Sequence, residues 1–106
     1  MRMIEKEMVR AINERKPWQK DNTQVSRQLV EGETEADDFE VMNVYLHGHE
    51  IASVFNVGTP EEFTTVDLGT LKQWPTRTTM SRLRALGVDV CTRKGVVHLD
   101  GKPLED

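Results

Sequence analysis

Two extended segments that meet at a tight turn constrain the fold of this chain more than any other feature. Side chains in residues 39–46 alternate as they do in a strand, with Phe39, Val41, Asn43 and Tyr45 on one face and Met42, Val44 and Leu46 on the other. His47-Gly48 favours a tight turn, after which residues 51–57 return as the partner strand. The segment therefore predicts an antiparallel hairpin, and with it a sheet.

Shorter strands are predicted on both sides of this hairpin. Residues 23–30 alternate in the same way, and residues 63–67 are rich in β-branched side chains. Residues 88–92 and 96–99 flank Arg93-Lys94-Gly95, a pattern typical of a second hairpin with glycine in its turn. Residues 31–38, which lie between the strand at 23–30 and the first hairpin, are too charged to pack and are expected to be a loop.

Helical periodicity is found in two places. Ile4, Met8 and Ile12 recur every four residues and predict a helix over about residues 2–15, which Pro17 ends. Its apolar stripe is narrow, so we expect it to lie on a sheet or on a second subunit. The second helix covers about residues 78–86, where threonines at the start can accept a bond from a free backbone N–H and Gly87 suits a left-handed C-terminal cap.

These elements predict an α+β fold. We expect an antiparallel sheet of five to six strands with an N-terminal helix and a second short helix near residues 78–86. The 106 residues are enough for one domain, with a helix at 1–16 and a sheet-and-helix core at 22–99. The chain has no signal-peptide pattern and no run of about 18 apolar residues, and its single cysteine, Cys91, excludes an internal disulfide. A reducing cytoplasm is the expected compartment.

Charge is strongly segregated along the sequence. Residues 31–67 carry ten acidic side chains and no lysine or arginine, although the net charge of the whole chain is only −4. Residues 68–94 carry six basic side chains and one acidic one. Either the two blocks neutralise one another across the folded domain, or they form separate surfaces that attract different partners.

The order of several short motifs resembles that of a family of small proteins encoded by tailed bacteriophages. The matching residues run from position 22 to about 99, and they are Asn22-Thr23, Leu46-His47-Gly48, Ile51-Ala52, Trp74, Thr76, Thr78-Thr79, Arg82-Leu83 and Ala85-Leu86. The helix at 1–16 lies outside these motifs and is expected to be an addition particular to this member. The resemblance implies a phage origin and expression in an infected bacterial cell, and it implies no enzymatic activity.

The first candidate site is the start of the second helix together with the basic hairpin that follows. Free N–H groups, threonine hydroxyls and arginines could bind an anion there, or the threonines could simply cap the helix. The arginines could also bind the phosphates of a nucleic acid, although we find no exposed run of aromatic residues for stacking on bases. The candidate residues are Trp74, Thr76, Arg77, Thr78, Thr79, Arg82, Arg84, Arg93 and Lys94.

The second candidate is an acidic patch. Clustered carboxylates can imitate a phosphate backbone and occupy a basic groove on a host protein, or they can form a solvated loop that keeps the chain soluble. The patch comprises Glu31, Glu33, Glu35, Asp37, Asp38 and Glu40.

No residue pattern points to catalysis or to a cofactor. His47 and His49 bracket a turn without a third ligand at suitable spacing, which makes a poor metal site, and Cys91 lies in a predicted strand with no local base. We therefore expect a binding protein rather than an enzyme, with no metal and no cofactor.

The leading hypothesis is a phage accessory protein in the host cytoplasm. It would bind a host bacterial protein, and so inhibit or redirect defence or transcription by steric occlusion. The alternative is a nucleic-acid-binding protein that uses the basic helix 77–86 and the hairpin 88–99. A homodimer through the N-terminal helix, with Met1, Met3 and Met8 against a symmetric copy, is a further option, and no membrane partner is expected.

Overall fold

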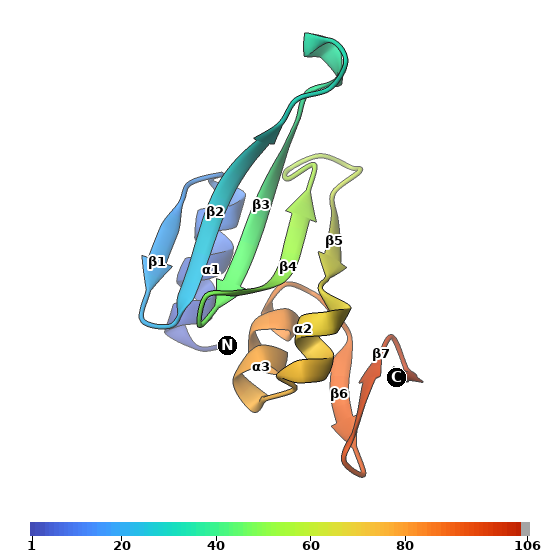
Figure 1. Ribbon diagram of the computed structural model, residues 1–106. Coiled ribbons are helices and arrows are strands. Elements are labelled where there is room, and N and C mark those ends of the chain that lie inside the picture. The colour runs from blue at the N-terminus through green and yellow to red at the C-terminus, as the bar shows by residue number, and fades with distance from the viewer. Residues whose placement is uncertain (105–106) are drawn as a thin grey trace.

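The computed structural model describes residues 1–104 and has the predicted α+β architecture (Figure 1). Its helices are α1 (Met3–Asn13), α2 (Leu68–Gln73) and α3 (Arg77–Ala85), with a short 3-10 turn, η1 (Glu35–Asp37). The five-stranded sheet contains β1 (Trp18–Lys20), β2 (Thr23–Val30), β3 (Phe39–Leu46), β4 (His49–Phe55) and β5 (Phe63–Val66). A smaller sheet contains β6 (Val90–Arg93), β7 (Val96–Leu99) and β8 (Lys102–Pro103).

Both sheets are antiparallel meanders, in which each strand pairs with the next one along the chain. The predicted hairpin is β3 and β4, and its turn has φ 52° at His47 and φ 80° at Gly48. Positive φ at both central residues is typical of the type I′ turn, whose twist matches that of the flanking strands. The pairing of β2 with β3 is longer and runs from Thr23 opposite Leu46 to Val30 opposite Phe39.

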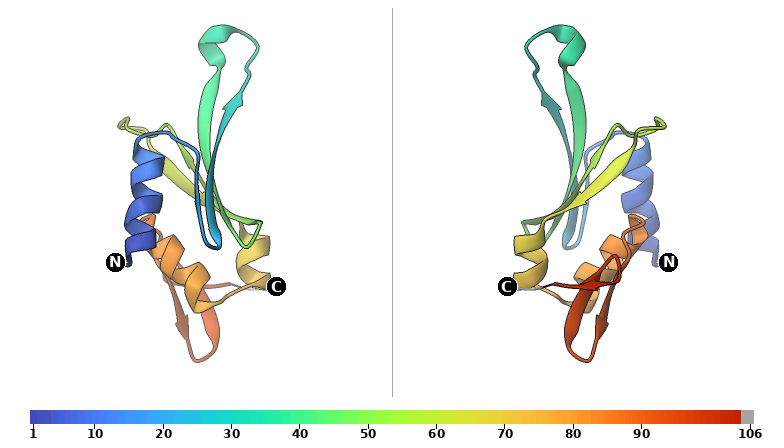
Figure 2. Two further views of the ribbon diagram at one scale, coloured as in Figure 1. Left: turned by 90° about the vertical axis from the view of Figure 1, so that its left-hand side faces the viewer. Right: turned by 90° about the vertical axis from the view of Figure 1, so that its right-hand side faces the viewer.

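The hydrophobic core lies between the large sheet and its helices. Met8 and Ile12 of α1 pack with Val25, Met42 and Val44 on one face of the sheet, and all five are at most 3% exposed. Figures 1 and 2 show α1 along this face and the smaller sheet below, connected through α3. The N-terminal helix therefore lies on the sheet, the first of the two arrangements that its narrow stripe allowed.

The position of Met8 changes the prediction of a dimer interface. Met8 is fully buried in the chain's own core, so it is not available to a second copy. Met1 and Met3 remain exposed on the same helix end.

Three elements were not predicted from the sequence. The short helix α2 begins after Asp67, whose carboxylate accepts a bond from the Thr70 N–H and so caps the helix. The two others are the edge strand β1 and the two-residue strand β8. With them, residues 1–104 form eight strands in two sheets, where the sequence predicted a sheet of five to six.

The molecule is elongated, with extents of 48 × 29 × 25 Å. The ends of β2 and β3 project beyond the rest of the large sheet and carry η1 at their tip, as both views show (Figures 1 and 2). The β6–β7 turn lies at the other end of the molecule. No helix among residues 1–104 is both long enough and apolar enough to cross a membrane.

Candidate functional site

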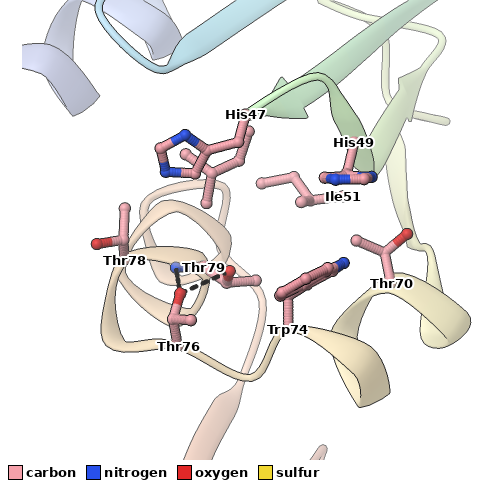
Figure 3. A pocket seen from close by; sticks show the side chains of 9 residues that line it. His47, His49, Ile51, Thr70, Trp74, Thr76, Thr78 and Thr79 are labelled. Atoms are coloured by element: carbon pink, nitrogen blue, oxygen red, sulfur yellow. Dashed lines mark hydrogen bonds between the residues drawn. The ribbon is translucent and has the colours of Figure 1, made fainter.

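A pocket of about 300 Å³ lies between the β3–β4 turn and the start of α3 (Figure 3). It brings together four of the predicted site residues, Trp74, Thr76, Thr78 and Thr79, with two histidines to which the sequence assigned only a turn. The full lining is Leu46, His47, His49, Ile51, Thr70, Trp74, Thr76, Thr78 and Thr79. Most of the motifs that carry the family resemblance therefore meet at one place.

Helix capping accounts for two of the threonines in this pocket. The Thr76 hydroxyl accepts a bond of 3.1 Å from the Thr79 N–H and lies 3.0 Å from the Thr79 hydroxyl. This arrangement starts α3 at Arg77, as the capping interpretation of these threonines expected. Thr79 is 1% exposed, so its hydroxyl serves the cap and not a ligand at the surface.

An aromatic stack and two buried aliphatic residues form the rest of the pocket. The rings of His49 and Trp74 stack with centroids 5.6 Å apart and an angle of 29° between their planes. Leu46 and Ile51 are 5% and 2% exposed. The pocket therefore offers an apolar floor, an aromatic wall and a few hydroxyl groups, and within residues 1–104 no group of three or more His, Cys, Asp or Glu side chains is placed to hold a metal ion.

Arg82 does not belong to this site, although the sequence placed it there. It is 3% exposed, and its guanidinium lies 2.9 Å from the Glu5 carboxylate of α1 and donates to the Thr23 hydroxyl of β2 at 3.0 Å. Ser81 donates a further bond to Glu5. Arg82 thus joins α3 to α1 and β2 inside the protein, and an anion or nucleic acid at the surface cannot reach it.

The same contacts set the charge state of Glu5. Burial raises the pKa of its carboxyl, but the hydrogen bonds from Ser81, Arg82 and the Arg2 backbone, with the positive charge of Arg82, more than offset this, and the net pKa lies below the ordinary value. Glu5 therefore stays ionised, as its partner requires.

The other predicted basic residues do not form a single surface. Arg84 uses its Nε to bond the Val90 carbonyl at 2.8 Å, which ties α3 to β6. Arg77 is exposed at the start of α3, and Arg93 and Lys94 are exposed in the β6–β7 turn at the end of the molecule (Figure 1). The structure thus buries one arginine of the predicted basic helix, Arg82, and leaves Arg77 and Arg84 exposed on α3, apart from the basic turn.

The acidic patch is gathered at the projecting end of the β2–β3 hairpin, which we call the acidic arm (residues 31–40). Glu31, Glu33, Glu35 and Asp37 are exposed, Asp38 accepts a bond from the Gly32 N–H, and Glu40 pairs with Arg27 at 2.7 Å. That pair lies at the base of the arm, and no other ion pair among the described residues involves this patch. The acidic arm and the basic β6–β7 turn therefore lie at opposite ends of the molecule and do not neutralise one another (Figure 1).

A row of aromatic rings escaped the sequence analysis. Phe39, Phe55 and Phe63 come from three adjacent strands and lie side by side, with Phe39 41% and Phe63 50% exposed. The expectation that the chain has no exposed run of aromatics was therefore wrong. The alternation in residues 39–46 already placed Phe39 and Val41 on one face. Alternation within one strand does not give the register between strands, and that register is what brings Phe55 and Phe63 beside Phe39.

Comparison with protein-family models identifies the family of this chain. The protein-family model described as Kyanoviridae Gp96 protein matches residues 1–104. The match includes α1, so the N-terminal helix is part of the family's common chain and not an addition particular to this member. Neither the curated proteins nor the solved structures contain a match to this chain.

Proposed function

The chain belongs to the Kyanoviridae Gp96 family of phage proteins, and from that premise we propose that it binds a protein of the infected host cell through the acidic arm. The arm would enter a basic groove on that protein. Occupation of the groove would then inhibit or redirect a host process such as defence or transcription, in the host cytoplasm. This action is stoichiometric binding and has no catalytic step.

One observation carries the proposal: the acidic arm stands away from the body of the protein (Figure 2), and of its six carboxylates only Glu40 forms an ion pair among the described residues. The sequence has no lysine or arginine between Arg27 and Lys72, and Arg27 is occupied by Glu40. Exposed charges of one sign that lie close together produce a field that steers an oppositely charged partner. A projecting hairpin also fits into a groove that a flat surface would not enter.

Affinity capture from a lysate of the host bacterium tests this proposal. The test variant changes Glu31, Glu33 and Glu35 to Gln, since these exposed side chains make no hydrogen bond in the arm. The matched control changes Asp21, Asp89 and Asp100 to Asn, which alters net charge equally at exposed positions of the body. We expect the arm variant to lose a host protein that the wild type and the control both retain.

Equal capture by all three chains would contradict a role for the arm. Equal loss in the arm variant and the control would also contradict it, because total charge and not the arm would then govern binding. Added salt should weaken the wild-type interaction, since exposed charges are screened within about 10 Å at 0.1 M ionic strength.

Nucleic-acid binding is the alternative proposal, and the exposed turn at Arg93 and Lys94 supports it. This turn projects at the end of the molecule opposite the acidic arm, where it could contact phosphates without repulsion from the carboxylates (Figure 1). Arg82 is buried, so α3 could add only the exposed arginines Arg77 and Arg84 to such a surface. A mobility shift with DNA or RNA at low salt that is abolished by Arg93→Ala with Lys94→Ala would favour this alternative.

A further inference from the structure

One face of the five-stranded sheet, which we call the open face, is not covered by another element of the described chain. The helix α1 packs on the face that carries Val25, Met42 and Val44, and Figures 1 and 2 show no helix or strand across the other face along β2 and β3. Apart from one bulge, every second strand residue faces this way. These residues are Gln19, Gln24, Ser26, Gln28, Val30, Phe39, Val41, Asn43, Tyr45, Glu50, Ser53, Phe55, Phe63 and Thr65.

The three phenylalanines form the apolar part of the open face, at the strand ends nearest the acidic arm, and we call them the phenylalanine row. The centroids of Phe55 and Phe63 are 4.8 Å apart with nearly parallel rings, and those of Phe39 and Phe55 are 6.3 Å apart. Val30 lies opposite Phe39 in the register and extends the row toward β2. Contiguous exposed apolar side chains with a polar border are typical of interaction surfaces.

Neutral polar side chains hold the rest of the open face in place. The Asn43 side-chain amide donates to Gln28 at 2.9 Å, and the Ser53 hydroxyl lies 2.9 Å from the Asn43 side-chain oxygen. Asn43 and Ser53 are 7% and 8% exposed, although no helix covers them. Because these groups are already ordered by their bonds, less conformational entropy would be lost when a partner docks.

Charge decides which kind of partner suits this face. Among the strand residues that the structure describes, the open face carries no lysine or arginine, and Glu50 is its one charged residue. The acidic arm continues from one end of the row, and Glu61 and Glu62 precede Phe63 at the other. A nucleic acid would meet carboxylates and no cation there, and a second copy would bring two acidic arms together.

We propose that the open face docks a protein surface whose apolar side chains rest on the phenylalanine row while lysines or arginines around them contact the acidic arm. This arrangement joins an apolar contact to neighbouring polar and charged contacts, a combination that ordinary protein–protein interfaces also have. It rests on the proposed host-protein function and adds to it the face that is used and the chemistry of the partner.

A peptide probe of defined chemistry tests this inference without knowledge of the host protein. The probe is a synthetic peptide of alternating lysine and leucine, and its control is a peptide of alternating lysine and serine with the same charge. Each is titrated into the full chain, labelled with nitrogen-15, and followed by NMR. The test variant is Phe39→Ser with Phe63→Ser, and the matched control is Leu68→Ser with Val96→Ser, which removes apolar side chains of 45% and 42% exposure elsewhere.

We expect the lysine–leucine peptide to shift resonances of β3, β4 and β5 around the phenylalanine row together with those of the acidic arm. The phenylalanine variant should bind it roughly tenfold more weakly or worse, as loss of central apolar contacts does, and the control variant should bind within about twofold of wild type. The lysine–serine peptide should shift resonances of the arm alone. Unchanged spectra outside the substituted positions will establish that both variants fold.

Three results would overturn the inference. The first is equal affinity of the wild type and the phenylalanine variant for the lysine–leucine peptide, and the second is resonance shifts confined to other surfaces. The third is a wild-type dimer in light scattering that the phenylalanine variant abolishes. The outcome is separable from that of the proposed function. Peptide binding at the row without any arm-dependent host capture would refute the host role alone. Arm-dependent capture that the phenylalanine variant retains in full would refute the use of the open face alone.

Discussion

Two glutamates of α1 form ion pairs of equal length with other elements, and together they allow a controlled test of what burial does to a charge. Glu5 lies 2.9 Å from Arg82 and Glu7 lies 2.9 Å from Lys20. The side chains of the first pair are each 4% exposed, whereas those of the second are 37% and 47% exposed. The perturbation is Glu5→Gln compared with Glu7→Gln, a change that keeps side-chain size and removes one carboxylate from α1.

The expected costs differ because only one cation is left in the interior. In Glu5→Gln the Arg82 guanidinium stays buried without a counterion, a situation that destabilises proteins by about 3–5 kcal/mol. In Glu7→Gln the Lys20 ammonium returns to water, so the loss should be about 0.2–1 kcal/mol. At about 4–8 °C per kcal/mol for a domain near this size, Glu5→Gln should lower Tm by roughly 12 °C or more, and Glu7→Gln by roughly 8 °C at most.

Urea unfolding followed by circular dichroism measures the loss of unfolding free energy in both variants. An unchanged slope of that free energy with urea concentration will show that all chains unfold between the same folded and unfolded states. Glu5→Leu with Arg82→Met should recover part of the loss, because a buried ion pair replaced by apolar groups is often near neutral. The recovery should be incomplete, because the Ser81 hydroxyl then lacks its partner and the Thr23 hydroxyl keeps only its bond to Asn22. Equal costs for Glu5→Gln and Glu7→Gln would refute the structural role given to Arg82.

Four further predictions follow from the same contacts. The folded-state pKa of Glu5 is lowered, so its contribution to stability should be complete above its unfolded pKa of about 4.3 and be lost as pH falls through the lower folded value. The unfolding free energies of the wild type and Glu5→Gln should therefore converge as the pH is lowered. Thr76→Ala removes the cap of α3 and should cost about 1 kcal/mol in urea unfolding, with Thr76→Ser close to wild type. A Cβ added at Gly32 would clash with the Asp37 Cβ and backbone, so Gly32→Ala should change the NMR resonances of the acidic arm while leaving those of the core in place. Arg93→Ala with Lys94→Ala should leave capture of the host protein unaltered, and a loss of capture would move the contact to the opposite end of the molecule.

Sequence periodicity was sufficient for the strands of four or more residues and for the two longer helices, but not for β1 and β8. Alternation of side-chain types along the sequence predicted β2 and β3, although burial does not alternate along β3, where Val41, Met42, Asn43 and Val44 are all buried. The helix α2 has six residues, including Gly69, which is too short for a 3.6-residue period to appear. Its one local signal was the capping carboxylate of Asp67.

The candidate site was predicted only in part because its contacts are long-range. Arg82 looked like a surface cation within a basic helix, and its partner Glu5 lies 77 positions away in the sequence. The helical stripe at Met80 and Leu83 could have indicated that residue 82 flanks the buried side, but no local pattern names an ion partner at that separation. His49 against Trp74 and the phenylalanine row depend in the same way on the register of strands and on where α2 ends.

Hydroxyl-radical footprinting of the complex between this chain and its captured host protein tests the central claim most directly, because the exposed rings and methionines report the open face, the pocket at Trp74 and the start of α1 separately. The free chain should be oxidised at Phe39, Phe63, Trp74, Met1 and Met3, which are between 41% and 73% exposed. The account predicts that the complex protects Phe39 and Phe63 and leaves Trp74, Met1 and Met3 as reactive as before. Protection of Trp74 or of the methionines with unchanged reactivity at both phenylalanines would contradict it.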